Sequence, residues 1–244
     1  MKAVILAAGY ATRLYPLTLD RPKPLLEVGG RPILDHLLDR LAPIGLERIY
    51  VVTNAKFAQR FREWASAHET VEVIDDATTS DDDKLGAIGD LGLVLEREHL
   101  AADLLVAAGD SLFSENLDGF ARYGQERDAP VIGVYDVGDL ELIKRYSAIE
   151  TDDDGRITLM EEKPADPQTT LTGIALYYYP QHVLPLIRRY LAEGNNPDQP
   201  GRLVQWLYPQ LPFYTWRLEG RWYDIGSHET LAAADAEFTK LAQG

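Results

Sequence analysis

The sequence predicts an α/β fold with a mostly parallel, mixed central sheet flanked by helices. Two observations predict it. Short buried-type strand runs alternate with amphipathic helical segments through the first half of the chain, an alternation typical of a parallel sheet covered on both faces. A hairpin and later strands then add an antiparallel edge. At 244 residues the chain fits one large domain, and we expect a single domain over 1–244.

The first half of the chain supplies four of the expected strands. The opening run KAVILAA is apolar and short, as in a buried strand, and the segment from Pro32 has an apolar helical face that closes at Gly45. The same signals recur further along. We expect strands at 2–8, 47–53, 71–75 and 103–109, and helices at 32–45, 55–68 and 86–98.

The second half carries the hairpin and the final helices. Asp154-Gly155 marks the turn of a hairpin over 147–160, and Ser227 is a suitable N-cap for the last helix. The loop GNNPDQPG is expected to be a surface connection, followed by a short helix. We also expect strands at 130–137, 171–180 and 212–219, a helix at 181–193, and a final helix after Ser227.

Composition limits the classes of partner. The net charge of −15 disfavours nucleic acid or an anionic membrane, because the field of the whole protein repels both. There is no cysteine for disulfides or thiolate metal sites. The apolar run that ends at Gly9 is too short to span a membrane, so we expect a cytoplasmic protein. The sequence leaves the oligomeric state open, a homo-oligomer included.

Charge is distributed unevenly along the chain. Residues 1–31 hold five cations against two acids, a local surplus of +3. This basic segment suits a small anionic ligand. The acidic run from Asp75 to Asp83 is expected to be a solvated loop.

The ends of the expected strands bring polar and small residues to one edge of the sheet. In open parallel sheets, ligands bind beyond the carboxyl ends of the strands. Those ends carry Ala8-Gly9, Asp75-Asp76 and Gly109-Asp110. After the first of them, small residues let a backbone approach a phosphate closely. Arg13 adds a bidentate donor and Lys23 a compact charge.

Five motifs extend in a fixed order along nearly the whole chain. They are LAAGYATRLYPLT with RPKPLLEVGGRPIL, the segment LGAIG at 85–89, Gly109-Asp110 with Phe113, EEKP at 161–164 with Thr172-Gly173, and WYDIG at 222–226. Together they resemble the motifs of the sugar-1-phosphate nucleotidylyltransferases, such as glucose-1-phosphate thymidylyltransferase-like enzymes.

The resemblance implies a Rossmann-like, GT-A-like nucleotidyltransferase fold and a reaction. A sugar 1-phosphate attacks the α-phosphorus of a nucleoside triphosphate, giving an NDP-sugar and pyrophosphate, with Mg²⁺ as the metal. It also implies a role for each matching residue. The catalytic residues are Arg13 and Lys23; the nucleotide-binding residues are Ala8, Gly9, Tyr10, Ala11, Thr12, Gly86 and Asp110; the sugar-phosphate residues are Glu162, Lys163 and Gly173; and the metal ligands are Asp110 and Asp224.

Several positions depart from the pattern of the family. Ala11 replaces its second glycine, and we expect Ala11 at negative φ, where alanine carries no strain. Because Pro164 follows it, Lys163 is expected in an extended backbone, with its side chain on the opposite side from that of Glu162. Tyr146-Ser147 replaces the Tyr-Gly that relatives have near the sugar, so the identity of the sugar stays open. TTSDDDK replaces the glutamine-containing segment with which relatives read thymine or uracil, so the identity of the base stays open as well.

Each candidate residue also has a structural reading. Asp110 or Asp224 could cap a following segment, and Glu162 with Lys163 could be a surface ion pair. We expect the tyrosines 177–179 to be core. The five histidines show no ligand spacing.

Three other functions compete with the nucleotidyltransferase reading. They are a phosphocholine-type cytidylyltransferase, a non-catalytic module that binds nucleotide-sugars, and a dinucleotide-binding dehydrogenase. The dehydrogenase fingerprint has a third glycine that opens a helix, and this chain has none after Gly9-Tyr10-Ala11. The EKP motif and Thr172-Gly173 argue against the cytidylyltransferase, because a choline headgroup calls for aromatic or acidic cage residues.

Overall fold

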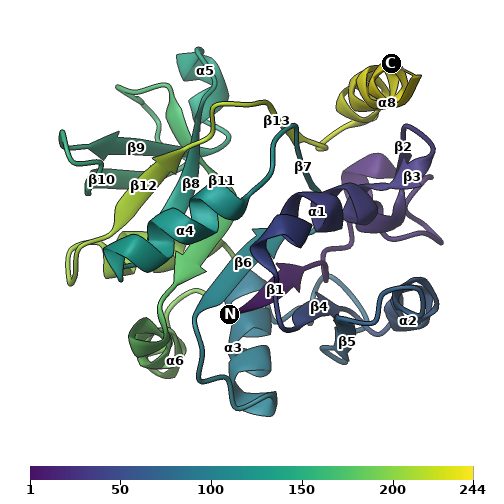
Figure 1. Cartoon of the computed structure of the whole chain (residues 1–244), viewed down its shortest axis with the longest axis horizontal. Coiled ribbons are helices and arrows are strands. Elements are labelled where there is room, and N and C mark those ends of the chain that lie inside the picture. The colour runs from purple at the N-terminus through teal and green to yellow at the C-terminus, as the bar shows by residue number, and fades with distance from the viewer. Residues whose placement is uncertain (244) are drawn as a thin grey trace. The chain divides into compact units, whose positions relative to one another are not determined.

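The computed structural model describes residues 1–243 and has the expected α/β fold. Seven strands form a mostly parallel sheet in the order β12-β8-β11-β6-β1-β4-β5, with helices flanking it (Figure 1). The chain divides into two compact units. The N-terminal unit holds Lys2–Leu85, Ala107–Asp118 and the chain from Gly220, and the central unit holds Gly86–Val106 and Gly119–Glu219 with Met1.

The N-terminal unit is built on three parallel strands. β1 pairs with β4 in the register Ala3↔Ile49, and β4 pairs with β5 in the register Ile49↔Val71. These strands and the helices after them confirm the sequence prediction to within a few residues at their ends. The elements are β1 Lys2–Leu6, β2 Glu27–Val28, β3 Arg31–Pro32, α1 Ile33–Leu41, β4 Ile49–Thr53, α2 Ala58–Ala65 and β5 Val71–Asp75, with 3-10 turns at Thr12–Leu14, Lys23–Leu25 and Ala42–Ile44.

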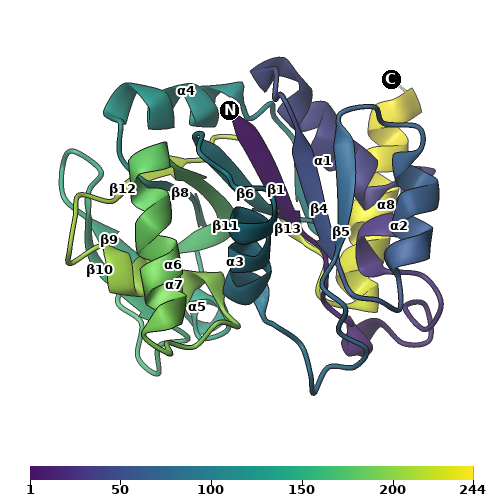
Figure 2. The same cartoon turned by 90° about the horizontal axis from the view of Figure 1, so that it is seen from below.

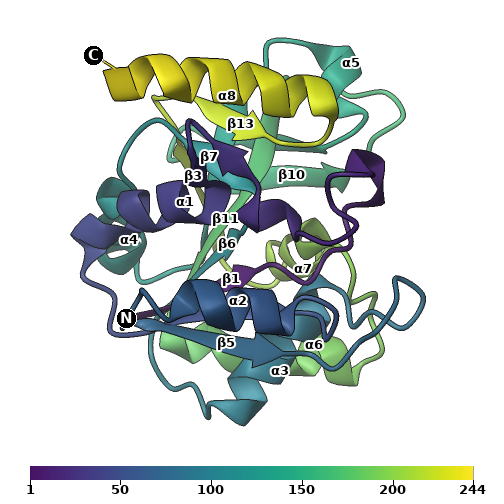
Figure 3. The same cartoon turned by 90° about the vertical axis from the view of Figure 1, so that its right-hand side faces the viewer.

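Two later stretches of the chain complete this unit. The strands β7 (Ser111–Phe113) and β13 (Trp222–Asp224) pair antiparallel, and neither was predicted as a strand. The helix α8 (His228–Gln243) packs on β13 and β2 (Figure 3). Ser227 caps this helix as expected, since its Oγ accepts the Thr230 backbone N–H at 3.2 Å.

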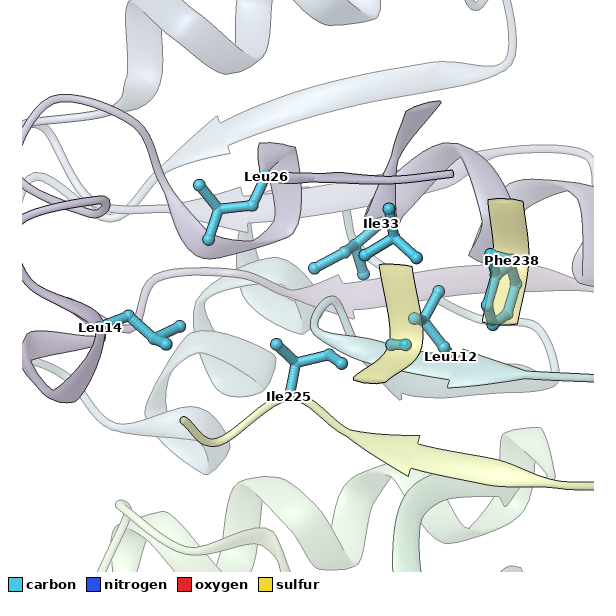
Figure 4. Packing of buried hydrophobic residues seen from close by; sticks show 8 residues of the cluster. Leu14, Leu26, Ile33, Leu112, Ile225 and Phe238 are labelled. Carbon is cyan, nitrogen blue, oxygen red and sulfur yellow. The ribbon is translucent and has the colours of Figure 1, made fainter. Parts of the chain in front are cut away.

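A hydrophobic cluster joins these late stretches to the basic loop near the N-terminus. Leu14 and Leu26 from that loop lie in one buried cluster with side chains of β7, the residue after β13, and α8 (Figure 4). The members are Leu14, Leu26, Val28, Ile33, Leu112, Ile225, Ala234 and Phe238. The loop that carries the predicted cations is therefore attached to a core.

The central unit has the mixed strands and the hairpin. β11 runs antiparallel to β8, and β12 runs parallel to it. The hairpin β9–β10 turns through Asp154-Gly155 as predicted. The strands are β6 Leu104–Ala108, whose last residues belong to the N-terminal unit, β8 Val131–Asp136, β9 Ser147–Thr151, β10 Ile157–Glu162, β11 Leu171–Tyr179 and β12 Tyr214–Arg217.

Helices of the central unit pack on one another and on its strands. α3 packs on α6 and α7, and α7 also contacts β10 and β11 (Figure 2). The three tyrosines that end β11 are core, as expected. The helices are α3 Ala87–Arg97, α4 Asp118–Arg127, α5 Leu140–Ile143, α6 Leu184–Ala192 and α7 Pro200–Leu207, with a 3-10 turn at Gln181–Val183. No helix within residues 1–243 is long and apolar enough to cross a membrane.

Candidate active site

The loop after β1 takes an unusual backbone path. Ala11 has φ 47° and ψ 44°, the left-handed conformation, so the prediction of a negative φ was wrong. A Cβ makes this conformation cost about 1–2 kcal/mol, which glycine would avoid. The loop therefore keeps the path that a glycine favours although this chain has alanine there.

Side chains hold the carbonyl groups at both ends of this loop. Asn54, buried just after β4, donates from Nδ2 to the Ala8 carbonyl oxygen at 2.8 Å. Thr18 donates from Oγ1 to the Ala11 carbonyl oxygen, also at 2.8 Å. Sequence reasoning missed both residues. A polar side chain between β4 and α2 was a signal for Asn54, whereas a threonine in a loop gave no signal for Thr18.

The amide groups of the same loop stay free. Within the part of the chain that the structure describes, no hydrogen bond occupies the backbone N–H groups of residues 9–12. Successive free N–H groups around a left-handed residue form a concave site for an anion. Tyr10 takes part only through its backbone, because its side chain is buried and burial raises the pKa of its phenol.

The two predicted catalytic cations lie in different surroundings. Arg13 is exposed and forms no ion pair with any described residue. Lys23 is mostly buried, and its Nζ lies 2.6 Å from Oδ2 of Asp110. The structure thus brings a predicted phosphate-binding lysine into contact with a predicted metal ligand.

The pairing of β7 and β13 brings the two predicted metal ligands to neighbouring positions of the backbone. Asp110 immediately precedes β7, and Asp224 is the last residue of β13, opposite Ser111. Asp224 is a strand residue, while Ser227 caps α8. No group of three or more histidine, aspartate or glutamate side chains gathers as a metal site within residues 1–243. Two carboxylates suit Mg²⁺, which takes one or two and completes its shell with phosphate oxygens and water.

The acidic segment behaves only partly as predicted. Asp81, Asp82 and Asp83 are exposed, and backbone N–H groups of residues 79 and 80 hold the pKa of the Asp83 carboxyl at about 2. Asp76 is instead buried, and its Oδ1 accepts the backbone N–H of Thr78 at 2.7 Å. The prediction of a solvated loop was therefore wrong for Asp76, whose carboxylate closes a turn.

In the central unit, Glu162 and Lys163 end the hairpin. Lys163 has φ 51°, so the prediction of an extended backbone before Pro164 was wrong. Its N–H donates to the Tyr146 carbonyl oxygen at 2.8 Å, which holds the bend. The alternation of side chains that an extended segment imposes does not apply here, and the Lys163 side chain is exposed.

Glu162 is largely enclosed by the start of α7. A Cβ on Gly201 would collide with Oε2 of Glu162, so glycine makes room for this carboxylate. Burial raises the pKa of Glu162, and the charges of Lys163 and Arg202 offset part of the rise. The carboxyl is partly buried, so Glu162 and Lys163 do not form an ordinary exposed ion pair. Gly201 and Arg202 were not singled out from the sequence.

Gly173 and Gly86 lie against other backbone segments of the central unit. The Gly173 N–H donates to the Oγ of buried Ser147 at 3.2 Å, which connects β11 to β9. Gly86 has φ 80°, and a Cβ there would lie 2.6 Å from the Cα of Asp198. The N–H of Ile88 donates to the Pro197 carbonyl at 2.7 Å. The loop before α7 therefore covers the start of α3.

The predicted site residues thus form two sets. The residues of each set belong to one unit. The N-terminal unit holds Ala8, Gly9, Tyr10, Ala11, Thr12, Arg13, Lys23, Asp110 and Asp224, and the central unit holds Gly86, Glu162, Lys163 and Gly173.

Comparison with known families covers nearly the whole chain. The sequence profile of the nucleotidyl transferase family matches residues 2–240. The chain belongs to this family. The match extends across both units, so each set of site residues lies within it.

Individual relatives carry more specific descriptions. UTP–glucose-1-phosphate uridylyltransferase AglF of Haloferax volcanii is 32% identical over 73% of this chain and 72% of its own length. The UTP–glucose-1-phosphate uridylyltransferase of Synechocystis is 29% identical over 93% of this chain and 60% of its own. The bifunctional protein GlmU of Methanocaldococcus jannaschii is 24% identical over 93% and 51%. The chain thus spans between half and three quarters of these relatives.

A solved structure has the same fold. It is that of a Bacillus anthracis protein described as a glucose-1-phosphate thymidylyltransferase, with a TM-score of 0.86 over 98% of this chain and 95% of that one. At 22% identity, this likeness concerns the fold.

Proposed function

We propose that this nucleotidyl transferase family member transfers a nucleotidyl group from a nucleoside triphosphate to a sugar 1-phosphate. A phosphate oxygen of the sugar 1-phosphate attacks the α-phosphorus. The bond from the α-phosphorus to the bridging oxygen breaks, and pyrophosphate leaves with that oxygen. The products are an NDP-sugar and pyrophosphate.

One arrangement in the N-terminal unit carries the proposal. The free N–H groups of residues 9–12 follow β1. Asp110 immediately precedes β7, Asp224 ends the strand β13 that pairs with β7, and Lys23 forms an ion pair with Asp110. Phosphoryl transfer depends mainly on positioning and on neutralising charge. A backbone anion site, a lysine and two hard oxygen ligands in one unit supply what that chemistry needs.

The metal that fits this set is Mg²⁺, with Asp110 and Asp224 as its protein ligands. Bound there, it would neutralise charge on the phosphates. Arg13 binds the departing pyrophosphate as a fork of donors, and Lys23 reduces the repulsion between the two anionic substrates.

The central unit carries the residues that we assign to the sugar 1-phosphate. Lys163 holds the 1-phosphate, and Glu162 accepts hydrogen bonds from ring hydroxyls, with Gly173 beside the sugar. Gly86 lies at the nucleotide. The family match extends across both units, which supports one catalytic domain over 1–244.

A substrate screen tests this function. Pyrophosphate release is measured with each of five nucleoside triphosphates and Mg²⁺ against a panel of sugar 1-phosphates and phosphocholine. We expect release with at least one sugar 1-phosphate and its loss with excess chelator. Faster turnover of phosphocholine than of every sugar would favour the cytidylyltransferase alternative. Nucleotide-sugar binding without any turnover would favour a non-catalytic module.

A further inference from the structure

The carbonyl group of Ala11 is held by two donors. Thr18 Oγ1 donates to it at 2.8 Å, and the Leu14 backbone N–H donates at 3.0 Å. Thr18 has no exposed surface, so water does not compete for its hydroxyl. With both acceptor positions of the oxygen used, the plane of the peptide between residues 11 and 12 has one orientation.

The fixed plane decides where the next amide points. In a trans peptide the C=O and N–H point in opposite directions. The N–H of Thr12 therefore points away from Thr18 and Leu14, and it is one of the free N–H groups of the loop. At the other end, Asn54 holds the Ala8 carbonyl and so orients the Gly9 N–H in the same way.

We propose that Thr18 is a positioning residue of the anion-binding loop, whose buried hydroxyl holds Ala11 in its left-handed conformation and aims the Thr12 N–H at the triphosphate. This inference rests on the proposed function. A glycine reaches the conformation without help, whereas alanine resists it. The Thr18 hydroxyl thus stabilises a conformation that a glycine at position 11 would adopt without strain.

The central test separates positioning from packing. Thr18→Val keeps the shape and removes the donor, and Thr18→Ser keeps the donor. Triphosphate affinity is measured by calorimetry without sugar phosphate, alongside KM for each substrate and Tm. We expect Thr18→Val to weaken triphosphate binding at least about fivefold, to leave the sugar 1-phosphate KM within about twofold, and Thr18→Ser to bind like wild type.

A matched control comes from the same unit. Thr53 is also fully buried, but its hydroxyl has no hydrogen-bond partner. Thr53→Val should leave triphosphate affinity unchanged. If Thr18→Val does not fold, Thr18→Cys, which keeps a weak donor of similar size, takes its place and should bind with intermediate affinity.

A second background asks whether Thr18 acts through Ala11. In Ala11→Gly protein, where the left-handed conformation carries no strain, Thr18→Val should weaken binding less than it does beside alanine. An equal loss in both backgrounds, equal affinities of wild type and Thr18→Val, or loss of Tm alone would overturn the inference. If wild type bound none of the five triphosphates, the proposed function would fail first and this inference with it.

Discussion

Two bends in this molecule have the same backbone conformation but differ in which of their groups are hydrogen-bonded. Ala11 in the N-terminal unit and Lys163 in the central unit are both non-glycine residues at positive φ, each shortly after a strand. At Ala11 a side chain holds the carbonyl and the neighbouring amides stay free. At Lys163 the amide itself is bonded to Tyr146, and the lysine side chain is exposed. One bend leaves its neighbouring backbone amides free, and the other leaves its side chain exposed.

This difference suits the two substrates proposed. Every nucleoside triphosphate has the same phosphate chain, which free N–H groups recognise whatever the base. Sugars differ in the arrangement of their hydroxyls, which side chains such as Glu162 would distinguish in the proposed function. Mutations in the first region should therefore affect all nucleotides alike, whereas mutations in the second should change sugar preference.

The largest effect is expected at the metal ligands of the N-terminal unit. Asp110→Asn and Asp224→Asn should each lower kcat at least about a hundredfold, because each removes charge that holds the metal against the phosphates. A titration with Mn²⁺ should show weakened metal binding in both. Asp82→Asn, at an exposed carboxylate of the same unit, is the control. Wild-type turnover of either variant at saturating Mg²⁺ would contradict the assignment of that aspartate as a metal ligand.

The two cations of the basic loop should separate kinetically. Arg13→Ala should raise KM for the triphosphate and lower kcat, about tenfold or more together, with the sugar 1-phosphate KM little changed. Lys23→Ala should affect both substrates, since Lys23 is bonded to Asp110. Initial rates with each substrate varied in turn measure this. The same small rise in KM for both variants with no change in kcat would show that the loop only reverses the chain and has no catalytic role.

In the central unit, Glu162 and Lys163 should differ in what they control. Glu162→Gln should change the ranking of sugar 1-phosphates, by about tenfold between the best and its competitor. Lys163→Ala should lower activity with all of them to a similar extent. Competition assays with paired sugar 1-phosphates give the ranking. An unchanged ranking in Glu162→Gln would remove this carboxylate from sugar recognition.

Gly201 tests the enclosure of Glu162. Gly201→Ala should push the carboxylate out of its position and raise the sugar 1-phosphate KM about fivefold, with the triphosphate KM unchanged. Gly119→Ala is a matched control in the same unit, because its Cβ would meet Trp216 at an ordinary contact distance of 3.7 Å. Equal KM values for the two glycine variants would contradict the role of Gly201.

The smallest effect is a pH dependence confined to the sugar half. Burial raises the pKa of Glu162, so lowering the pH protonates this carboxyl earlier than an exposed glutamate. The sugar 1-phosphate KM should rise by about two- to threefold as the pH falls through the raised pKa. The folded state also binds this proton more tightly, so stability from Glu162 is present at low pH and declines as the pH rises. Glu162→Gln should abolish both trends.

Much of the fold could be predicted because its strands are buried. Runs such as IYVVT are apolar throughout, and their sequence alone marks them as core strands. The strands β7 and β13 were missed because each has only three residues and pairs with a partner about a hundred positions away. That pairing brings Asp224 beside β7. The motif order predicted the two carboxylates as metal ligands, but the strand pairing that places them at neighbouring positions is seen only in the structure.

The errors concern backbone angles, which local preference sets poorly. Alanine and a residue before proline both disfavour positive φ, and the sequence predictions for Ala11 and Lys163 followed those preferences. In the structure the Ala11 carbonyl accepts a hydrogen bond from Thr18, and the Lys163 amide donates one to the Tyr146 carbonyl. Each partner lies several residues away in the sequence, so the residues beside the bend do not reveal it.

The cluster around Leu14 also has a consequence for the order of synthesis. Its members come from the basic loop, from β7 and from the last helix, so this core stays incomplete until the chain from Gly220 has left the ribosome. The central unit needs no residue beyond Glu219 and can close first. A nascent chain therefore leaves Leu14 and Leu26 without Ile225, Ala234 and Phe238 for most of its translation, and the loop that carries Leu14 gains this part of its support late in folding.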